Sequence, residues 1–238
     1  MYKIYKKRYI FYIMKTVIII PYRNRESHLM YYLNKSLPEL KKVIDNLEVV
    51  VVEQEEGKKF NRGKIINVGY KYYGNKDNYY ITQDVDVNPC NKDTIQMYNE
   101  KVKEDEFVGI YSDGGTLGGV VKFTGKTFEK VNGFPNNYWG WGHEDKDLSN
   151  RAEYYDCHIR RIIKFDEYKK KAEYFKIFED NHNRQDCGLW SIPYRLWKTT
   201  SYENKEKYIK SNGLSSCNYK ILKKEQLMEG VVKIVVEI

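Results

Sequence analysis

Short runs of apolar and β-branched residues recur along the first half of the chain, and each predicts a buried strand. These runs are Thr16–Ile20, Val49–Val52 and Tyr79–Thr82. Between them, Glu26 to Leu40 and Asn61 to Tyr73 carry apolar residues at helical spacing. Strands that alternate with helices predict an α/β fold, with a mixed, mostly parallel central sheet and flanking helices.

The second half of the chain follows a different order. Gly118–Phe123 predicts another strand, and Glu144–Tyr155 predicts a helix that opens with acidic residues, as the helix dipole favours. Two late runs, Tyr219–Leu222 and Val231–Val236, are expected to form an antiparallel pair. Because no repeat or Pro/Gly/Ser-rich linker interrupts the chain, we expect a single domain over 1–238, with its core at about 15–238.

The composition is that of a folded protein, because 41% of the 238 residues are hydrophobic and 31% are charged. The formal net charge of +8 comes from lysines spread along the chain. Solubility is the simpler interpretation of this charge, and attraction to a phosphorylated or membrane-surface partner is the alternative. No nucleic-acid partner is expected, because no basic helix or aromatic sheet motif is recognisable.

The first 20 residues are basic and then apolar, so a membrane or targeting segment has to be considered. Lys15 interrupts the apolar run well short of the about 20 residues that a membrane span needs, and no transmembrane segment is expected. Cys90, Cys157, Cys187 and Cys217 lie far apart and form no CxxC pair, which favours a reduced protein. We therefore expect a cytoplasmic location, in the host cytoplasm if the protein is viral.

Residues 132–151 (NGFPNNYWGWGHEDKDLSNR) combine two tryptophans with glycines and an acidic cluster, where a helix is about to begin. Glycine lets a ligand approach the backbone closely, and indole offers a flat apolar face with one polar group. Such a surface suits a sugar ring, and a carboxylate beside it could accept a hydroxyl proton. Glu144 and Asp145 would also stabilise the first helical turn, and the two interpretations are compatible.

A pair of aspartates, Asp84 and Asp86, follows the predicted strand at Tyr79–Thr82. In open α/β sheets, ligands bind beyond the carboxyl ends of the strands. Carboxylate oxygens at such an end suit Mg2+ or Mn2+, and a divalent ion would neutralise the diphosphate of a departing nucleotide. A DxD sequence by itself is more often a solvated turn. Here it stands after an apolar strand and before the Trp/Gly segment (132–151), and in this position it indicates a site for a metal ion and a nucleotide.

Two loops rich in arginine and aromatic residues accompany these elements. PYRNR (21–25) follows the first predicted strand, and FNRGK (60–64) opens the second predicted helix. Arginine and aromatic side chains at these places could hold a nucleotide base, a ribose and a phosphate. A basic loop without a ligand is the simpler interpretation of either one taken alone.

Together these segments resemble the β-1,4-galactosyltransferase family (glycosyltransferase family 7) and its viral or bacterial-type relatives. The segment NNYWGWG-x-ED is the most specific of them. The matching segments are collinear: VIIIPYRNRESHL (17–29), FNRGKIINVGY (60–70), DVD (84–86), LGGVVKFTGKTFEKVNGFPNNYWGWGHED (117–145) and NGLSSCNYKIL (212–222).

The resemblance implies a nucleotide-diphospho-sugar transferase fold of the GT-A type. It also implies an inverting, Mn2+-dependent transfer of a hexose or N-acetylhexosamine from a UDP-sugar to a hydroxyl of a glycan or glycoconjugate acceptor, forming a β linkage. UDP-Gal and UDP-GalNAc are the expected donors. By motif match, Asp145 is the general base, Glu144 is its carboxylate neighbour, and Asp86 and His182 hold the metal.

The same resemblance assigns the remaining site residues. Those expected to bind the nucleotide sugar are Pro21, Tyr22, Arg23, Arg25, Phe60, Arg62, Asp84, Val85 and Trp141. Those expected to bind the acceptor are Gly119, Trp141, Gly142, His143, Glu144 and Asp145. Trp141 matches the tryptophan of a mobile loop that closes over the donor and excludes water.

Some positions depart from the family pattern. Where the family has a further metal ligand, methionine or histidine, this chain has Glu179 or Asp180, and an oxygen ligand could shift the preference from Mn2+ towards Mg2+. His143 and Lys146 stand beside the acceptor where other residues are usual, which points to an unusual or charged acceptor. Thr116 takes the place of an aromatic residue in the donor-sugar pocket, and the smaller side chain would leave room for an N-acetyl group.

Two other classes of protein fit parts of the sequence. A non-catalytic protein that binds glycans or nucleotide sugars on the same scaffold would tolerate the loss of Asp86 or Asp145, yet both are present. A glycoside hydrolase could pair Asp84 and Asp86 with the carboxylates at 144 and 145. A hydrolase needs no nucleotide, and the two arginine loops would then have no role.

Overall fold

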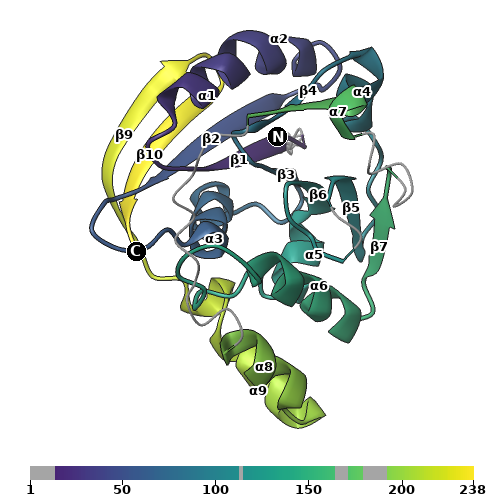
Figure 1. Ribbon diagram of the computed structural model, residues 1–238, viewed down its shortest axis with the longest axis vertical. Coiled ribbons are helices and arrows are strands. Elements are labelled where there is room, and N and C mark those ends of the chain that lie inside the picture. The colour runs from purple at the N-terminus through teal and green to yellow at the C-terminus, as the bar shows by residue number, and fades with distance from the viewer. Residues whose placement is uncertain (1–13, 113–114, 164–170, 179–191) are drawn as a thin grey trace, which may run out of the picture.

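The computed structural model describes residues 14–112, 115–163, 171–178 and 192–238. Within them an eight-stranded sheet forms the centre of the molecule (Figure 1). From one edge to the other, its strands are β7 (His158–Arg161), β5 (Glu106–Tyr111), β6 (Val120–Thr124), β3 (Tyr79–Gln83), β1 (Thr16–Tyr22), β2 (Leu47–Gln54), β10 (Val231–Glu237) and β9 (Lys220–Met228).

The sheet is mixed and mostly parallel. Parallel pairs join β1 to β2 and β3, β2 to β10, and β5 to β7. Strand β6 runs antiparallel to both of its neighbours, and β9 runs antiparallel to β10. The expected antiparallel pair near the C-terminus is therefore confirmed, as is the α/β class.

Helices cover both faces of the sheet, because side chains of a strand point alternately to its two sides. Ile18 and Ile20 of β1 belong to one apolar layer, and Val17 and Ile19 belong to the other. The first layer is covered by α1 (Glu26–Tyr31), the π-helical turn Tyr32–Ser36, α2 (Leu37–Leu40) and α4 (Lys92–Met97). The second is covered by α3 (Arg62–Tyr73), α5 (Gly125–Lys130) and α6 (Glu144–Tyr154).

Smaller elements complete the chain. Strands β4 (Val87–Pro89) and β8 (Phe175–Ile177) pair antiparallel beside α7 (Lys171–Tyr174). Helices α8 (Ile192–Thr199) and α9 (Tyr202–Ser211) and the 3-10 turn Leu214–Ser216 precede β9, and α8 and α9 lie at the opposite end of the molecule from α2 (Figure 1). No helix in the described ranges is long and apolar enough to span a membrane.

Each predicted strand and helix has a counterpart, with shifted ends in several cases. The helical region after β1 contains a π-helical turn, and the strand expected at Tyr219–Leu222 extends to Met228. The parallel strands β1, β2 and β3 are neighbours, so the segments that follow them emerge at one edge of the sheet. These segments are 23–25, 55–61 and 84–86, and the last two lie next to the start of α3.

Candidate active site

Arg62 joins two parts of the chain that the sequence places far apart. It is the first residue of α3, whose start is fixed by the Asn61 side chain accepting a hydrogen bond from the backbone N–H of Lys64 at 2.9 Å. Its Nε lies 2.8 Å from Oδ1 of Asp84, and its Nη1 lies 3.4 Å from Oε1 of Glu144. One guanidinium therefore connects the end of β3 to the start of α6.

The environment of Arg62 leaves part of this guanidinium for a ligand. Burial lowers the pKa of Arg62, but the carboxylates of Asp84 and Glu144 outweigh this effect and raise that pKa above its ordinary value. Its Nη2 is buried and has no hydrogen-bond partner in the described part of the chain. Because buried donors are nearly always paired, this N–H is suited to an oxygen of a bound ligand.

Asp84, Asp86, Glu144 and Asp145 form a cluster of carboxylates around Arg62. Together they carry more negative charge than this one guanidinium can balance. Burial, with a further contribution from Asp145, raises the pKa of Glu144 to about 7, against the opposing effect of Arg62. Burial also raises the pKa of Asp84, again against the effect of Arg62, and both Asp86 and Asp145 add to the rise. Such an excess of carboxylate is what a bound cation would relieve.

Glu144 gives this cluster a measurable effect on stability. Its folded pKa of about 7 lies above the ordinary 4.5, so between these values the folded protein binds more protons than the unfolded chain. The contribution of Glu144 to stability therefore falls as the pH rises through this window, and the loss is complete above it. We expect Glu144→Gln to raise the free energy of unfolding at pH 8 by on the order of 1–2 kcal/mol, with little change at pH 5. Urea denaturation at both pH values measures this, and an equal change at both would contradict it.

Asp86 pairs with an arginine of the first loop. Its Oδ2 is 3.0 Å from Nη1 of Arg25, and both side chains are about one quarter exposed, at 25% and 27%. Its backbone carbonyl accepts a hydrogen bond from the N–H of Phe178 at 2.9 Å, so the chain just after β8 reaches the metal-binding aspartate that the sequence predicts.

The chemistry of these residues fits a divalent cation in part. Carboxylate oxygens are ligands that Mn2+ and Mg2+ accept. Within the described ranges, no three His, Cys, Asp or Glu side chains converge as a metal cluster would, so further ligands would have to come from elsewhere. The other predicted ligands, His182 and Glu179 or Asp180, lie outside the described residues.

Asp145 lies against the segment 115–119. Its carbonyl accepts from the backbone N–H of Leu117 at 3.2 Å, and a Cβ added to Gly118 would come within 2.7 Å of its Oδ2. Lys146 extends the contact, since its Nζ donates to the Gly115 carbonyl at 2.6 Å. Gly119 has a φ of +68°, and a Cβ there would lie only 2.3 Å from the Tyr111 carbonyl oxygen, which explains the glycine. The donor-specificity candidate Thr116 and the acceptor candidate Gly119 thus flank, in the sequence, the two residues that lie against the predicted base.

The Trp/Gly segment lies beside the cluster, with Trp141 on its surface. Trp141 is 60% exposed, and the glycines on either side of it have φ values of +105° and +115°. The backbone N–H of Gly140 donates to the Phe60 carbonyl at 2.7 Å. His143 also has a positive φ, of 69°, and its ring centroid lies 5.1 Å from that of Tyr194 on α8. These contacts place the tryptophan, the second arginine loop and the carboxylates in one region.

Not every predicted nucleotide contact is available as a side chain. The guanidinium of Arg23 lies over the ring of Phe60, with its Cζ 5.2 Å from the ring centroid, which brings the two loops together. Pro21 and Tyr22 belong to β1, and the side chains of Tyr22 and Val85 are buried in the apolar layer under α1. These two residues could therefore reach a nucleotide only through their backbone groups.

A buried ion pair that sequence reasoning missed supports the Trp/Gly segment. Asp147 Oδ1 lies 2.8 Å from Nε of Arg151, one helical turn later, and both side chains are fully buried. Tyr138 and Tyr208 donate to the other oxygen of Asp147 at 2.9 and 3.0 Å, and Arg151 donates to the carbonyl of Gly133. The i,i+4 spacing of an acid and an arginine was the available signal, but that pattern is common on exposed helix faces.

Comparisons with known proteins show the family of this chain. Residues 5–99 match a family profile described as the N-terminal region of glycosyl transferase group 7. Residues 101–180 match one described as the N-terminal domain of galactosyltransferase. The chain belongs to the group 7 glycosyltransferases. The family expected from the sequence motifs is therefore confirmed.

Individual members of glycosyltransferase group 7 show how far the likeness extends. Human β-1,4-galactosyltransferase 4 is 35% identical over 226 residues, which are 90% of this chain and 60% of the human protein. A β-N-acetyl-D-glucosaminide β-1,4-N-acetylglucosaminyltransferase of Lymnaea stagnalis is 40% identical over 148 residues, 58% of this chain and 30% of that protein. The chain thus spans less than two thirds of the length of these relatives.

A solved structure confirms the fold of this group 7 member. A mutant of Drosophila β-1,4-galactosyltransferase 7, in complex with manganese, UDP-Gal and xylobiose, superposes with a TM-score of 0.68. The two are 23% identical, and the match covers 94% of each chain. The expected GT-A type fold is therefore confirmed.

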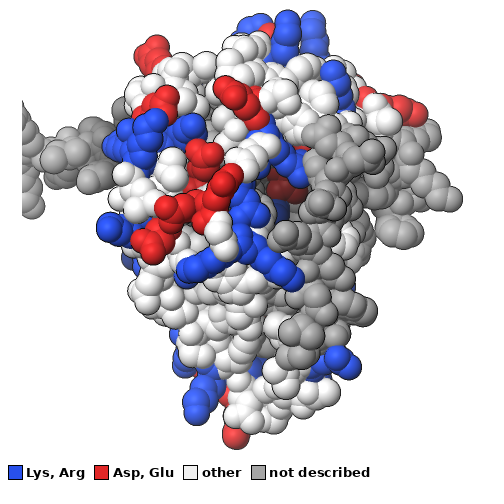
Figure 2. All heavy atoms as spheres, turned by 60° about the vertical axis from the view of Figure 1, so that its left-hand side comes forward, with Lys and Arg blue, Asp and Glu red and all other residues white. Residues whose placement is uncertain are grey.

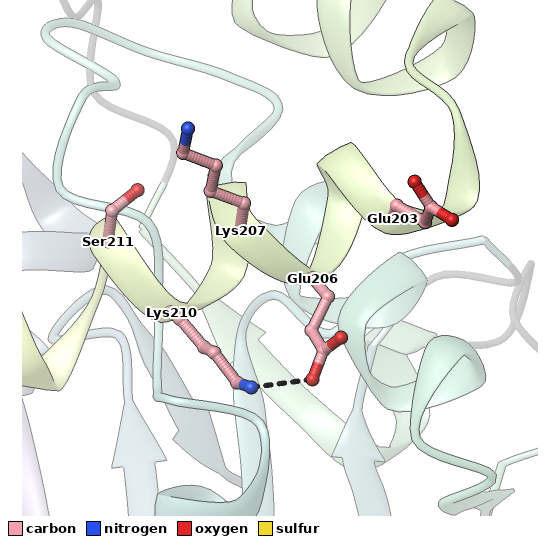
Figure 3. Close-up of a pocket in the computed structure, with 5 residues that line it drawn as sticks. All are labelled: Glu203, Glu206, Lys207, Lys210 and Ser211. Atoms are coloured by element: carbon pink, nitrogen blue, oxygen red, sulfur yellow. Dashed lines mark ion pairs between the residues drawn. The ribbon is translucent and has the colours of Figure 1, made fainter.

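Two hollows in the surface of the described part of the chain lie away from the predicted site residues. A hollow of about 380 Å³ is lined by side chains of α9 alone, where Glu206 and Lys210 pair at 2.6 Å (Figure 3). Another, of about 490 Å³, lies between the π-helical turn and α4, and no predicted site residue lines either one. Acidic and basic side chains are interspersed over the face drawn in Figure 2, which fits the interpretation of the lysines as aiding solubility.

Proposed function

We propose that this protein is an inverting, metal-dependent glycosyltransferase that moves galactose or N-acetylgalactosamine from its UDP derivative to a sugar hydroxyl and forms a β linkage. The observation that carries this proposal is the bridge from Asp84 through Arg62 to Glu144, which unites the strand-end acidic pair with the acceptor carboxylates. The Drosophila relative, in complex with manganese, UDP-Gal and xylobiose, supports the same donor, ion and class of acceptor.

The donor side would be built from Asp86, Arg25 and Arg62. Asp86 and His182 would hold Mn2+, with Glu179 or Asp180 as a further ligand and Mg2+ as the alternative ion. When bound, the ion would neutralise the diphosphate that leaves with UDP. Phe178, whose backbone N–H donates to the Asp86 carbonyl, stands four residues before His182 in the sequence. The Nη2 of Arg62, which has no hydrogen-bond partner among the described residues, is suited to an oxygen of the donor.

The acceptor side would use Asp145 as the base. The acceptor oxygen attacks the anomeric carbon, the bond to the phosphate oxygen of UDP breaks, and the hydroxyl proton passes to the Asp145 carboxylate. A single displacement inverts the configuration at that carbon. Glu144 is less suited to the role, because its side chain is buried and contacts the guanidinium of Arg62. It would hold the acceptor, together with Gly119, Gly142 and His143.

Trp141 would close over the bound donor. It is exposed between two glycines with positive φ, so its backbone neighbours tolerate conformations that other residues rarely adopt. Closure would exclude water and so limit hydrolysis of the donor. The contact of Gly140 with Phe60 links this segment to the donor side.

Thr116 is proposed to let an N-acetylated donor enter. It precedes the segment 117–119 that contacts Asp145, and its side chain is small. The Lymnaea relative is named as an N-acetylglucosaminyltransferase, so the family is not restricted to galactose. We expect turnover of UDP-Gal and UDP-GalNAc with Mn2+, and we expect Thr116→Tyr to lower kcat/KM for UDP-GalNAc by about tenfold or more while sparing UDP-Gal.

UDP release and product formation with UDP-Gal, UDP-GalNAc, UDP-Glc and UDP-GlcNAc test both points. Thr116→Ser, which keeps a small hydroxylated side chain, is the matched control. Turnover of UDP-Gal alone by the wild-type protein would overturn the pocket argument. Binding of UDP-sugars without any turnover would identify the non-catalytic alternative.

A further inference from the structure

The turn Asp84–Val87, which carries both aspartates of the donor side, is held at each of its carbonyl oxygens. The donors come from β3, from β4 and from Phe178 just after β8, and two of them are buried amide side chains. The Asp84 carbonyl accepts hydrogen bonds from Nε2 of Gln83 at 2.9 Å and from the backbone N–H of Val87 at 3.1 Å. The Val85 carbonyl accepts one from Nδ2 of Asn88 at 3.5 Å, and the Asp86 carbonyl accepts one from the backbone N–H of Phe178 at 2.9 Å. The Val87 carbonyl accepts a second hydrogen bond from Nε2 of Gln83, at 2.5 Å.

Gln83 is the centre of this arrangement. It is the last residue of β3, it is fully buried, and its amide donates on both sides of Asp86. Its Oε1 accepts a hydrogen bond from the Tyr98 hydroxyl at 2.7 Å. Burying an amide is costly unless its polar atoms are paired, and here both of them are. The Gln83 side chain thus links the two ends of the turn, at the Asp84 and Val87 carbonyls.

Tyr98 fixes Gln83 in turn. It is fully buried just after α4, and burial raises its pKa well above the ordinary value. The hydroxyl therefore stays protonated and donates at any working pH. On the other side of the turn, Ser36, at the end of the π-helical turn, donates to Oδ1 of Asn88 at 2.8 Å. Interruptions of this kind in a helix are often found at functional sites.

We propose that the Gln83–Tyr98 pair is a positioning device that sets the affinity of the donor side for its metal and UDP. The inference rests on the proposed function. The carboxylates of Asp84 and Asp86 extend from a backbone whose carbonyls are held by the protein, so both side chains start from fixed positions. Without the Gln83 amide, the Val87 carbonyl loses the hydrogen bond from that amide, and the Asp84 carbonyl loses one of its two hydrogen bonds. The backbone of the turn then relaxes, and the Asp86 carboxylate is no longer held in a single orientation toward the ion.

Two variants test the pair, and the chain provides a matched control. Gln83→Leu removes the amide, and Tyr98→Phe removes only the hydroxyl that orients it. Tyr32→Phe removes a hydroxyl that is as deeply buried in the same apolar layer and has no hydrogen-bond partner among the described residues. The free Mn2+ signal in electron paramagnetic resonance, recorded with UDP present and without acceptor, gives the affinity for the ion independently of turnover.

We expect Gln83→Leu to weaken Mn2+ binding about tenfold and Tyr98→Phe about threefold, with Tyr32→Phe unchanged. In steady-state assays, KM for Mn2+ should rise in the first two variants while KM for the acceptor stays the same. A general loss of packing would instead raise both constants or lower the melting temperature alone. If Tyr98→Phe folds and both constants match those of the wild-type protein, the inference is wrong, even if Gln83→Leu fails to fold.

One further variant separates this inference from the proposed function. Asp86→Ala should abolish Mn2+ binding in the presence of UDP. If it does so while both pair variants bind Mn2+ like the wild-type protein, only the positioning role fails. If Asp86→Ala binds Mn2+ normally, the proposed donor side itself is wrong.

Discussion

Asp145→Asn is expected to lower the rate of sugar transfer by between about a hundredfold and ten-thousandfold, the range that general-base catalysis contributes. The amide has nearly the same shape as the carboxylate and can keep the packing against Gly118, but it cannot accept the hydroxyl proton. Because Asp145 is assigned to the acceptor side, the affinity for UDP and Mn2+ should change little. Transfer to the acceptor and UDP binding by calorimetry are the two measurements.

The same helix offers a control for this substitution. Glu153 lies on α6 and is exposed, so Glu153→Gln makes the corresponding change of charge away from the cluster. It should leave transfer and UDP binding unchanged. If Asp145→Asn kept more than a tenth of the wild-type rate with the same melting temperature, Asp145 would not be the base, and Glu144 would be the next candidate.

Asp86→Ala is expected to reduce transfer at least about a thousandfold, because stabilisation of the leaving diphosphate by a metal contributes several kcal/mol. The substitution also leaves Arg25 without the carboxylate that it contacts at 3.0 Å. Higher Mn2+ concentrations should restore only a small part of the activity. Asp45→Ala, which removes an exposed aspartate from the loop before β2, serves as the control and should behave like the wild-type protein.

The elements that sequence patterns predicted are those with a strong apolar signal. β1, β2 and β3 are buried on both faces, and their runs of Val, Ile and Tyr reflect this directly. Strand β7 has the sequence HIRR and carries no such signal, since it is an edge strand defined by its pairing with β5. Strands β4 and β8 have three residues each, too short for any period to be recognised.

The candidate site was predictable in its residue types, and less so in its connections. The acidic pair after β3 and the carboxylates at the start of α6 stand out in the sequence, but the bridge by Arg62 joins positions 22 and 82 residues away. No local pattern reports such a contact. Tyr22 and Val85 were assigned to the nucleotide by motif, yet their side chains face the core. The hydrogen bond between Gln83 and Tyr98 could not be predicted from the sequence either, because glutamine at a strand end has no characteristic partner.

The most direct test of the account is the rate of sugar transfer from UDP-Gal by the wild-type protein and by Asp86→Ala, first in EDTA and then as Mn2+ is restored. The account predicts that EDTA abolishes transfer by the wild-type protein, that Mn2+ restores it, and that the variant remains at least about a thousandfold slower than the wild-type protein after Mn2+ is restored. Undiminished transfer by Asp86→Ala in EDTA would contradict it.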